Sequence, residues 1–170
     1  MRTNRQMRRL ADVLVESIRV PVPAEPEAVF DGLVAAVADW RGREIVVRRE
    51  AFPPQLGSGL WLEAAEYDVI VVDGRAALWH QIVILCHEVW HMHRREGDGV
   101  READGVPLAV AARTDFSVAE EQEAERFGML MGRRLRGWLE EPGEPAAGGE
   151  GADGLAGRIG AALNYRGPRG

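Results

Sequence analysis

Apolar positions follow a helical spacing near the start of the chain. Along residues 5–19 they recur every three or four positions, which places them on one face of a helix. They are Met7, Leu10, Ala11, Leu14 and Ile18. A second helix is expected from Pro26, because proline suits a first helical turn and nearby Glu25 and Glu27 suit the helix dipole. Its buried stripe is predicted to comprise Ala28, Val29, Phe30, Leu33, Val37 and Trp40, with Gly42 ending it.

The pattern then changes to that of short strands. Residues 44–49, 60–63 and 67–72 are short, apolar and rich in β-branched or aromatic side chains, with prolines and glycines between them. After Asp73-Gly74, residues 75–92 are apolar around much of a helical circumference, which is typical of a buried helix. We therefore expect three strands followed by a central helix.

The end of the chain divides into a loop, a helix and a tail. Residues 94–114 are expected to form a connecting loop. Ser117, with Glu120 three positions later, predicts a capping box that begins a helix running to about Leu139. Residues 141–170 are rich in Gly, Ala, Glu and Pro, a composition that favours a disordered tail. The chain thus predicts one α+β domain over residues 1–140, with a small three-stranded sheet packed against helices.

Composition indicates the class of protein and the compartment in which this domain is expected. The chain has 170 residues, 46% hydrophobic and 28% charged, as in ordinary globular proteins. No apolar run approaches the roughly 20 residues that cross a bilayer, and no apolar segment typical of a secretory signal follows the basic N-terminus. The single cysteine, Cys86, agrees with a reducing compartment, so a cytoplasmic location is expected. The net charge of −6 argues against broad nucleic-acid binding.

The strongest chemical signal is the sequence His87-Glu88-Val89-Trp90-His91 near the end of the central helix. On a helix, a four-residue step places both imidazoles on one face, where they can clamp a divalent metal, most often zinc. Glu88 is placed to take a proton from a metal-bound water. This H-E-x-x-H segment therefore predicts two ligands and a general base.

A catalytic zinc site usually has a third protein ligand, and the acidic segment 119–127 offers candidates. Glu121 and Glu125 share a helical face with Ala124, whose small side chain allows a close approach to another helix. Glu121 is our first choice as ligand, with Glu125 orienting a histidine from outside the metal shell. Glu123 and Glu120 remain alternatives.

These residues together define a family resemblance. A strand, the helix ending in His87-Glu88-Val89-Trp90-His91, and the later Glu121-Gln122-Glu123-Ala124-Glu125-Arg126-Phe127 resemble the ImmA/IrrE-type metallopeptidases, which are similar to minimal gluzincins. The similarity covers about residues 25–132. It implies a zincin-like fold, Zn²⁺ as cofactor, and endopeptidase activity toward a protein partner, a helix-turn-helix repressor of transcription.

Four positions depart from the family pattern. Trp90 stands where the family has glycine, Glu125 replaces Asn or Asp, and Gly128 replaces alanine. Gly132 follows Leu130-Met131 where the family has proline. We expect the Trp90 indole to pack under its helix rather than narrow the substrate cleft. Two other functions stay open: a metal-bearing binding module that holds its regulator without cutting it, and a toxin of a toxin–antitoxin pair.

Three further side chains are candidates for oxyanion or substrate contact. His80 lies seven residues before His87, on nearly the same helical face two turns away. His93 follows the motif, where a cation also suits the end of a helix. Tyr67 opens the third strand. Each also has a simple structural interpretation, as an exposed helix residue, a helix-end cation and a strand residue.

Overall fold

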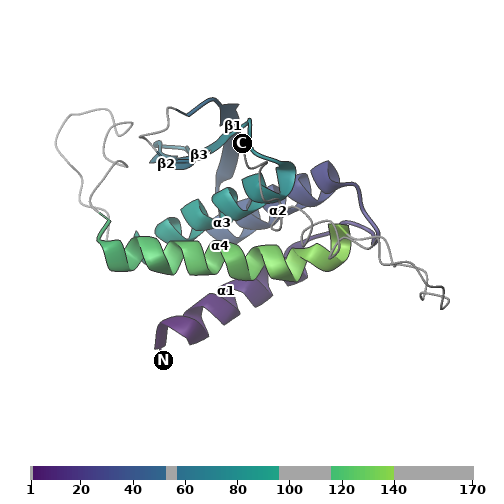
Figure 1. The fold of residues 1–170 in the computed structure, drawn as a ribbon, viewed down its shortest axis with the longest axis horizontal. Helices are drawn as coiled ribbons and strands as arrows, with labels where there is room; N and C mark the ends of the chain where they lie inside the picture. The colour runs from purple at the N-terminus through teal and green to yellow at the C-terminus, as the bar shows by residue number, and fades with distance from the viewer. Residues whose placement is uncertain (1, 53–56, 96–115, 140–170) are drawn as a thin grey trace, which may run out of the picture.

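The computed structural model describes residues 2–52, 57–95 and 116–139. Within these ranges the chain is α+β, with four helices and one small sheet (Figure 1). The elements are α1 (Arg2–Ser17), α2 (Pro26–Arg41), β1 (Glu44–Glu50), β2 (Gly59–Glu63), β3 (Tyr67–Asp73), α3 (Leu78–Arg95) and α4 (Val118–Leu139). The predicted tail 141–170 and most of the predicted loop 94–114 lie outside the described residues.

The sheet is mixed and has β3 at its centre. The strand order is β1-β3-β2, with β1 parallel to β3 and β2 antiparallel to it. Ile45, Trp61, Ile70 and Val72 are buried, and α2 and α3 pack against the strands. Figure 1 shows α4 running alongside α3 on the side away from the sheet, with α1 below it. The three predicted strands and the packing of helices on the sheet are confirmed.

Both N-terminal helices form close to where their apolar patterns predict. The five predicted core positions of α1 are all buried, although the helix itself ends at Ser17, just before Ile18. Gly42 ends α2 in the left-handed conformation, with φ of 71°. Two positions of the predicted α2 stripe differ from the prediction: Ala28 is exposed and Trp40 is only partly buried, while Ala36 is buried instead.

The central helix begins later than predicted. It starts at Leu78 rather than residue 75, because a turn intervenes in which the Ala76 N–H donates to the Asp73 carbonyl. The Asp73 carboxylate also accepts hydrogen bonds from the backbone and guanidinium of Arg75, and this contact lowers the pKa of Asp73. At its other end α3 continues to Arg95.

The start of α4 forms the predicted capping box. The Glu120 carboxylate accepts a hydrogen bond from the Ser117 N–H at 2.7 Å, and the Ser117 hydroxyl accepts one from the Glu120 N–H at 3.3 Å. These contacts satisfy donors that the first turn of a helix leaves without partners. The first turn of α4, which carries Glu121, is therefore fixed locally.

Small residues bring α4 close to α3. Ala124 is fully buried, and a Cβ added at Gly128 would lie 2.7 Å from the Val83 carbonyl oxygen. A Cβ at Gly132 would overlap the Trp79 ring. These three residues recur every fourth position along α4, so they form one stripe. Glycine at positions 128 and 132, where the family pattern has alanine and proline, therefore allows the two helices to pack closely.

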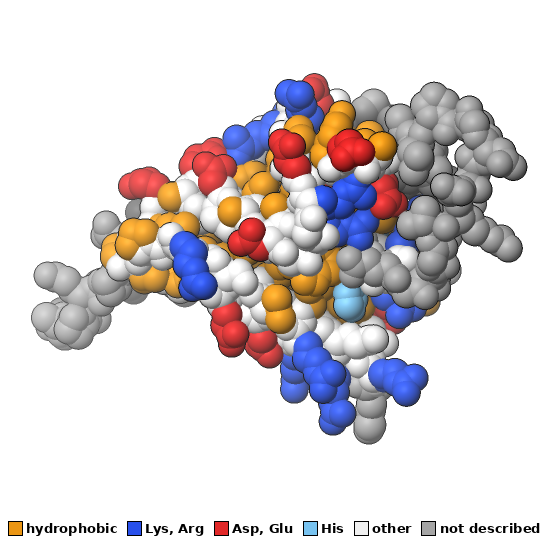
Figure 2. Space-filling model, turned by 180° about the vertical axis from the view of Figure 1, so that it is seen from behind, with side chains coloured by type: hydrophobic (Ala, Val, Ile, Leu, Met, Phe, Trp, Pro, Cys, Tyr) orange, Lys and Arg blue, Asp and Glu red, His pale blue; other side chains and the backbone are white. Residues whose placement is uncertain are grey.

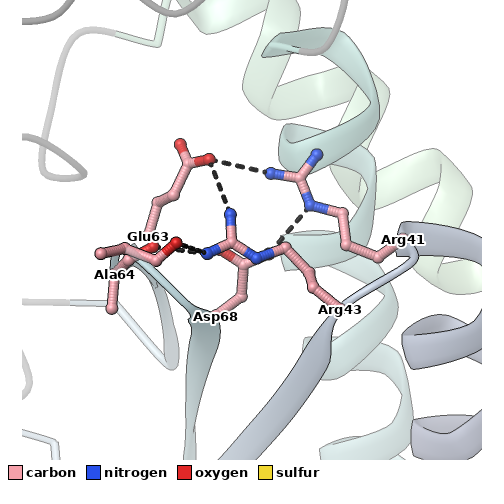
Figure 3. Close-up of polar contacts among 6 residues, drawn as sticks. Arg41, Arg43, Glu63, Ala64 and Asp68 are labelled. Atoms are coloured by element: carbon pink, nitrogen blue, oxygen red, sulfur yellow. Dashed lines mark hydrogen bonds and ion pairs between the residues drawn. The ribbon is translucent and has the colours of Figure 1, made fainter.

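Charged side chains of both signs lie among apolar ones on the surface (Figure 2). One partly buried cluster of charged side chains, shown in Figure 3, ties the end of α2 to the sheet. Arg41 Nε donates to the Asp68 carboxylate at 2.8 Å, while Glu63 accepts from Arg41 at 3.2 Å and from Arg43 at 3.3 Å. Since Asp68 is fully buried, removing its arginine partners would leave a costly uncompensated charge.

None of the described helices has both the length and the apolar character needed to cross a membrane.

Candidate metal centre

Helices α3 and α4 bring together two imidazoles and one carboxylate. His87 Nε2 lies 3.1 Å from His91 Nε2 and 3.2 Å from Glu121 Oε2. His91 Nε2 lies 3.4 Å from Glu121 Oε1. Among the described residues this is the group of His, Cys, Asp and Glu that could hold a metal ion. The carboxylate that lies beside the two histidines is thus that of Glu121, the residue that helical geometry had favoured as the third ligand.

The spacing of these atoms is compatible with tetrahedral zinc. Ligands about 2.0 to 2.2 Å from Zn²⁺ in a tetrahedron lie roughly 3.3 to 3.6 Å apart, and the three observed distances of 3.1, 3.2 and 3.4 Å are close to that. The protonation states also suit a metal. Burial lowers the pKa of His87, and burial followed by the charge of His87 lowers the pKa of His91 to about 3. Both rings are then neutral at pH 7, with lone pairs free for a cation.

The Glu88 carboxyl lies beneath β2 and is only 7% exposed. A Cβ added at Gly59 would lie 2.6 Å from Glu88 Oε1, so the glycine makes room for this carboxyl. Burial and the charge of Glu121 raise the pKa of Glu88 to about 8, while a hydrogen bond from the Trp61 backbone opposes the shift. A bound divalent cation would lower this pKa again.

An open groove of about 470 Å³ runs beside the candidate metal centre. His80 and His87 lie along it, as their seven-residue spacing predicts. Its apolar lining is Val83, Ile84, Phe116, Val118 and Met129, and its other polar lining is Ser58, Glu121, Gln122 and Glu125. The centre is therefore accessible from the surface.

Sequence reasoning missed Gly59 and Phe116. The Phe116 ring stacks on His91, with 3.6 Å between ring centroids, and so covers one side of a candidate ligand. A glycine inside a strand often marks a close approach, so Gly59 carried a signal in the sequence. Phe116 carried no such signal, because its contact with His91 joins α3 to a residue two positions before α4, far away in the sequence.

The other three candidate carboxylates of α4 make no direct contact with the histidine pair. Glu125 is exposed in the groove, and its charge favours the protonated form of His87, but no hydrogen bond to either histidine is present among the described residues. Glu123 lies 3.6 Å from Arg94 Nε, and Glu120 is held in the capping box. The structure therefore brings neither Glu120 nor Glu123 to the histidine pair.

Two candidates for substrate contact lie away from the groove lining. The His93 ring contacts the rings of Trp90, at 5.1 Å between centroids, and Trp40, at 6.1 Å. Tyr67 is 40% exposed at the start of β3, whereas Ser58 of the groove hydrogen-bonds Asp73 at the other end of that strand. Of the three candidates only His80 is brought to the groove.

The expectation that Trp90 packs under its helix is confirmed. The indole is fully buried, and its centroid lies 5.2 Å from that of Phe127 on α4. It therefore fills space between α3 and α4 rather than narrowing the groove. Cys86 is also fully buried, and burial raises the pKa of its thiol. Such a thiol is a poor nucleophile.

Comparison of the chain with protein-family models, curated proteins and solved structures finds no match.

Proposed function

We propose that this chain is a zinc-dependent endopeptidase in which His87, His91 and Glu121 hold the metal. One observation carries the proposal. Two helices place two neutral imidazoles and a carboxylate within 3.4 Å of one another, beside an open groove. A fourth group, Glu88, follows the first histidine directly. This donor set, two histidines and one carboxylate, is that of a catalytic rather than a closed structural zinc site.

Glu88 has the chemistry of a proton carrier for peptide hydrolysis. When bound, Zn²⁺ supplies a Lewis acid that polarises the carbonyl and lowers the pKa of water to about 7. Glu88 accepts a proton as the water oxygen bonds to the carbonyl carbon. It then delivers that proton to the leaving nitrogen as the C–N bond breaks. Its position under Gly59 and beside the Trp61 backbone keeps the carboxyl in one orientation.

The groove fits an extended peptide segment better than a folded surface. Its volume of about 470 Å³ is that of a small-molecule site, which is enough for a few side chains. Val83, Ile84 and Met129 offer apolar contacts, and His80 offers a hydrogen-bonding group farther along α3. The substrate is therefore a protein cut at an accessible segment.

The identity of that protein rests on family resemblance. The H-E-x-x-H and Glu121-to-Phe127 segments resemble those of ImmA/IrrE-type peptidases, so the proposed substrate is a helix-turn-helix repressor in the cytoplasm. Cleavage would relieve repression.

A paired measurement of zinc content and cleavage tests this proposal. Glu88→Gln keeps the shape of the side chain but removes the base, so it should retain zinc and lose cleavage of a co-expressed repressor. Glu121→Gln should lose zinc, whereas Glu123→Gln, which alters only the contact with Arg94, should keep both properties. Cleavage by Glu88→Gln would show the base to be wrong. Loss of zinc in Glu123→Gln alone would exclude Glu121.

A metal-bearing binding module is the rival function in the same chain. Its sequence support came from Trp90 and Gly132, and both residues pack between α3 and α4. Neither departure therefore favours a module without catalysis. A stable, uncut complex formed equally by wild type and Glu88→Gln would select it.

A further inference from the structure

One carboxylate of the groove makes no ion pair with the rest of the described chain. Glu125 lines the groove beside the candidate metal centre. Among the described residues it makes neither a hydrogen bond nor an ion pair, although Arg126 and Arg133 border a neighbouring hollow with it. The Nε of Arg126 donates instead to the Gln122 carbonyl at 3.1 Å. The Glu125 carboxylate is therefore available to a ligand that enters the groove.

Two other acidic groups belong to the metal centre itself. Glu121 lies beside both histidines, and Glu88 follows the first of them in the chain. The two negative charges of these residues would together balance a Zn²⁺ ion at the centre. Glu125 adds one more negative charge to the groove lining. With the ion in place, the groove would therefore attract a cationic group more than an anionic one.

The antiparallel packing of α3 and α4 sets the position of Glu125 along the groove. Glu121 lies beside His87, whereas the later Gly128 approaches the earlier Val83. Glu125 lies between these two levels of α4. From Glu121 to Glu125 the helix rises about 6 Å, and an extended peptide advances about 3.3 Å per residue. A substrate side chain one or two residues from the bond at the metal is therefore level with Glu125.

Apolar side chains line the groove near Glu125. Met129 comes one turn later on α4 and is 40% exposed, and Val83 lines the groove from α3. Lysine and arginine side chains carry their charge at the end of a long apolar stem, which they bury along apolar surfaces while the charged head stays in water. A carboxylate beside two apolar side chains fits both parts of such a side chain.

We propose that Glu125 selects a substrate with a lysine or arginine one or two residues from the cut bond. The stem of that side chain lies on Val83 and Met129, and its cationic head pairs with the Glu125 carboxylate. Because Glu125 makes no hydrogen bond to either histidine among the described residues, its carboxylate is not committed to orienting them. This inference rests on the proposed peptidase function, since it takes the groove as the substrate site.

Peptide binding to the full chain tests the selection without the need for turnover. Glu88→Gln, which should keep zinc and not cut, is titrated in the presence of Zn²⁺ with three hexapeptides. They are identical except at one central position, which holds arginine, norleucine or glutamate. The methyl signals of Met129 and Val83 report binding by NMR. The arginine peptide should bind about 3- to 10-fold more tightly than the norleucine peptide, as expected for an exposed charge-assisted contact, and the glutamate peptide should bind most weakly.

Substitutions at Glu125 in the same background separate the effect of charge from that of shape. Glu125→Gln should make the arginine and norleucine peptides bind equally. Glu125→Lys should make the glutamate peptide the tightest of the three. Glu123→Gln is the matched control, because it removes the same charge from α4 at a residue that contacts Arg94 instead of lining the groove. It should keep the preference for arginine.

Three results would overturn the proposal. The first is equal binding, or no binding, of the three peptides. The second is a preference for arginine that persists in Glu125→Gln. The third is a loss of zinc in Glu125→Gln with unchanged relative affinities, because Glu125 would then position a metal ligand.

Cleavage of the arginine peptide by the wild type is measured separately. Selective binding without cleavage would overturn the peptidase function and leave a groove that selects cationic peptides. Cleavage of the three peptides at equal rates, with equal affinities, would overturn the selection by Glu125 and leave the peptidase function standing.

Discussion

Replacing Gly128 by alanine tests how closely α4 approaches α3. The new Cβ would lie 2.7 Å from the Val83 carbonyl oxygen, about 0.7 Å less than the 3.4 Å at which ordinary contact begins. A second contact, to Val83 Cγ1, would be 3.1 Å. The carbonyl belongs to a helix backbone and cannot rotate away. The two helices must therefore separate.

Two opposing effects determine how much Gly128→Ala changes the free energy of unfolding. Alanine in a helix is favoured over glycine by about 1 kcal/mol, whereas overpacking a tight contact costs about 1 to 3 kcal/mol. Gly137→Ala is a matched control on the same helix, because nothing lies within 4 Å of its Cβ position. The propensity gain cancels between the two variants. Gly128→Ala should therefore be less stable than Gly137→Ala by about 1 to 3 kcal/mol.

Denaturant unfolding of the metal-free chain, followed by circular dichroism, measures this difference. The same separation would carry Glu121, two turns before Gly128, away from His87. Zinc affinity, measured by competition with a chelating dye, should therefore fall in Gly128→Ala and stay unchanged in Gly137→Ala. If both variants gain the same stability, the close approach of α3 and α4 is wrong.

Three further predictions concern the same site. Gly59→Ala should lower cleavage but retain zinc, measured by turnover and metal content, because its Cβ would displace the Glu88 carboxyl; unchanged turnover would contradict the contact. Ser117→Ala should cost about 1 kcal/mol of unfolding free energy through loss of the cap, whereas Val118→Ala, at an exposed position, should cost little. In the metal-free chain the pKa of Glu88 is raised by burial from 4.5 to about 8. The unfolded state then releases its proton first, so stability falls as pH rises from about 4.5 to 8, by at most about 1.4 kcal/mol per unit. Unfolding titrations of Glu88→Gln should lack this slope, and an identical slope would refute the burial argument.

Local patterns predicted most of the secondary structure. The three- and four-residue spacing of Met7, Leu10 and Leu14 located α1, and Ser117 with Glu120 located the start of α4, because these signals act within one or two helical turns. The pairing of His87 and His91 on one face of a helix was equally predictable from the sequence. A four-residue step on any helix brings two imidazoles to one face.

The start of α3 and the burial of α2 were less predictable. Ala76 and Ala77 continue the apolar pattern, yet the Asp73 carboxylate holds Arg75 in a turn. Ala28 and Ala36 differ in burial because α2 turns one face toward α1, α3 and the sheet. Because alanine is found on buried and exposed faces alike, the sequence does not show which of these two alanines faces the core.

The sequence by itself determined the helices, the strands and the histidine pair with its adjacent Glu88. Tertiary structure decided which carboxylate of α4 meets that pair, that β3 lies between β1 and β2, and that Gly59 and Phe116 enclose the centre. Spacing along one element is fixed by backbone geometry. A contact between elements depends instead on how closely they pack, and here that distance is set by Ala124, Gly128 and Gly132 lying against α3.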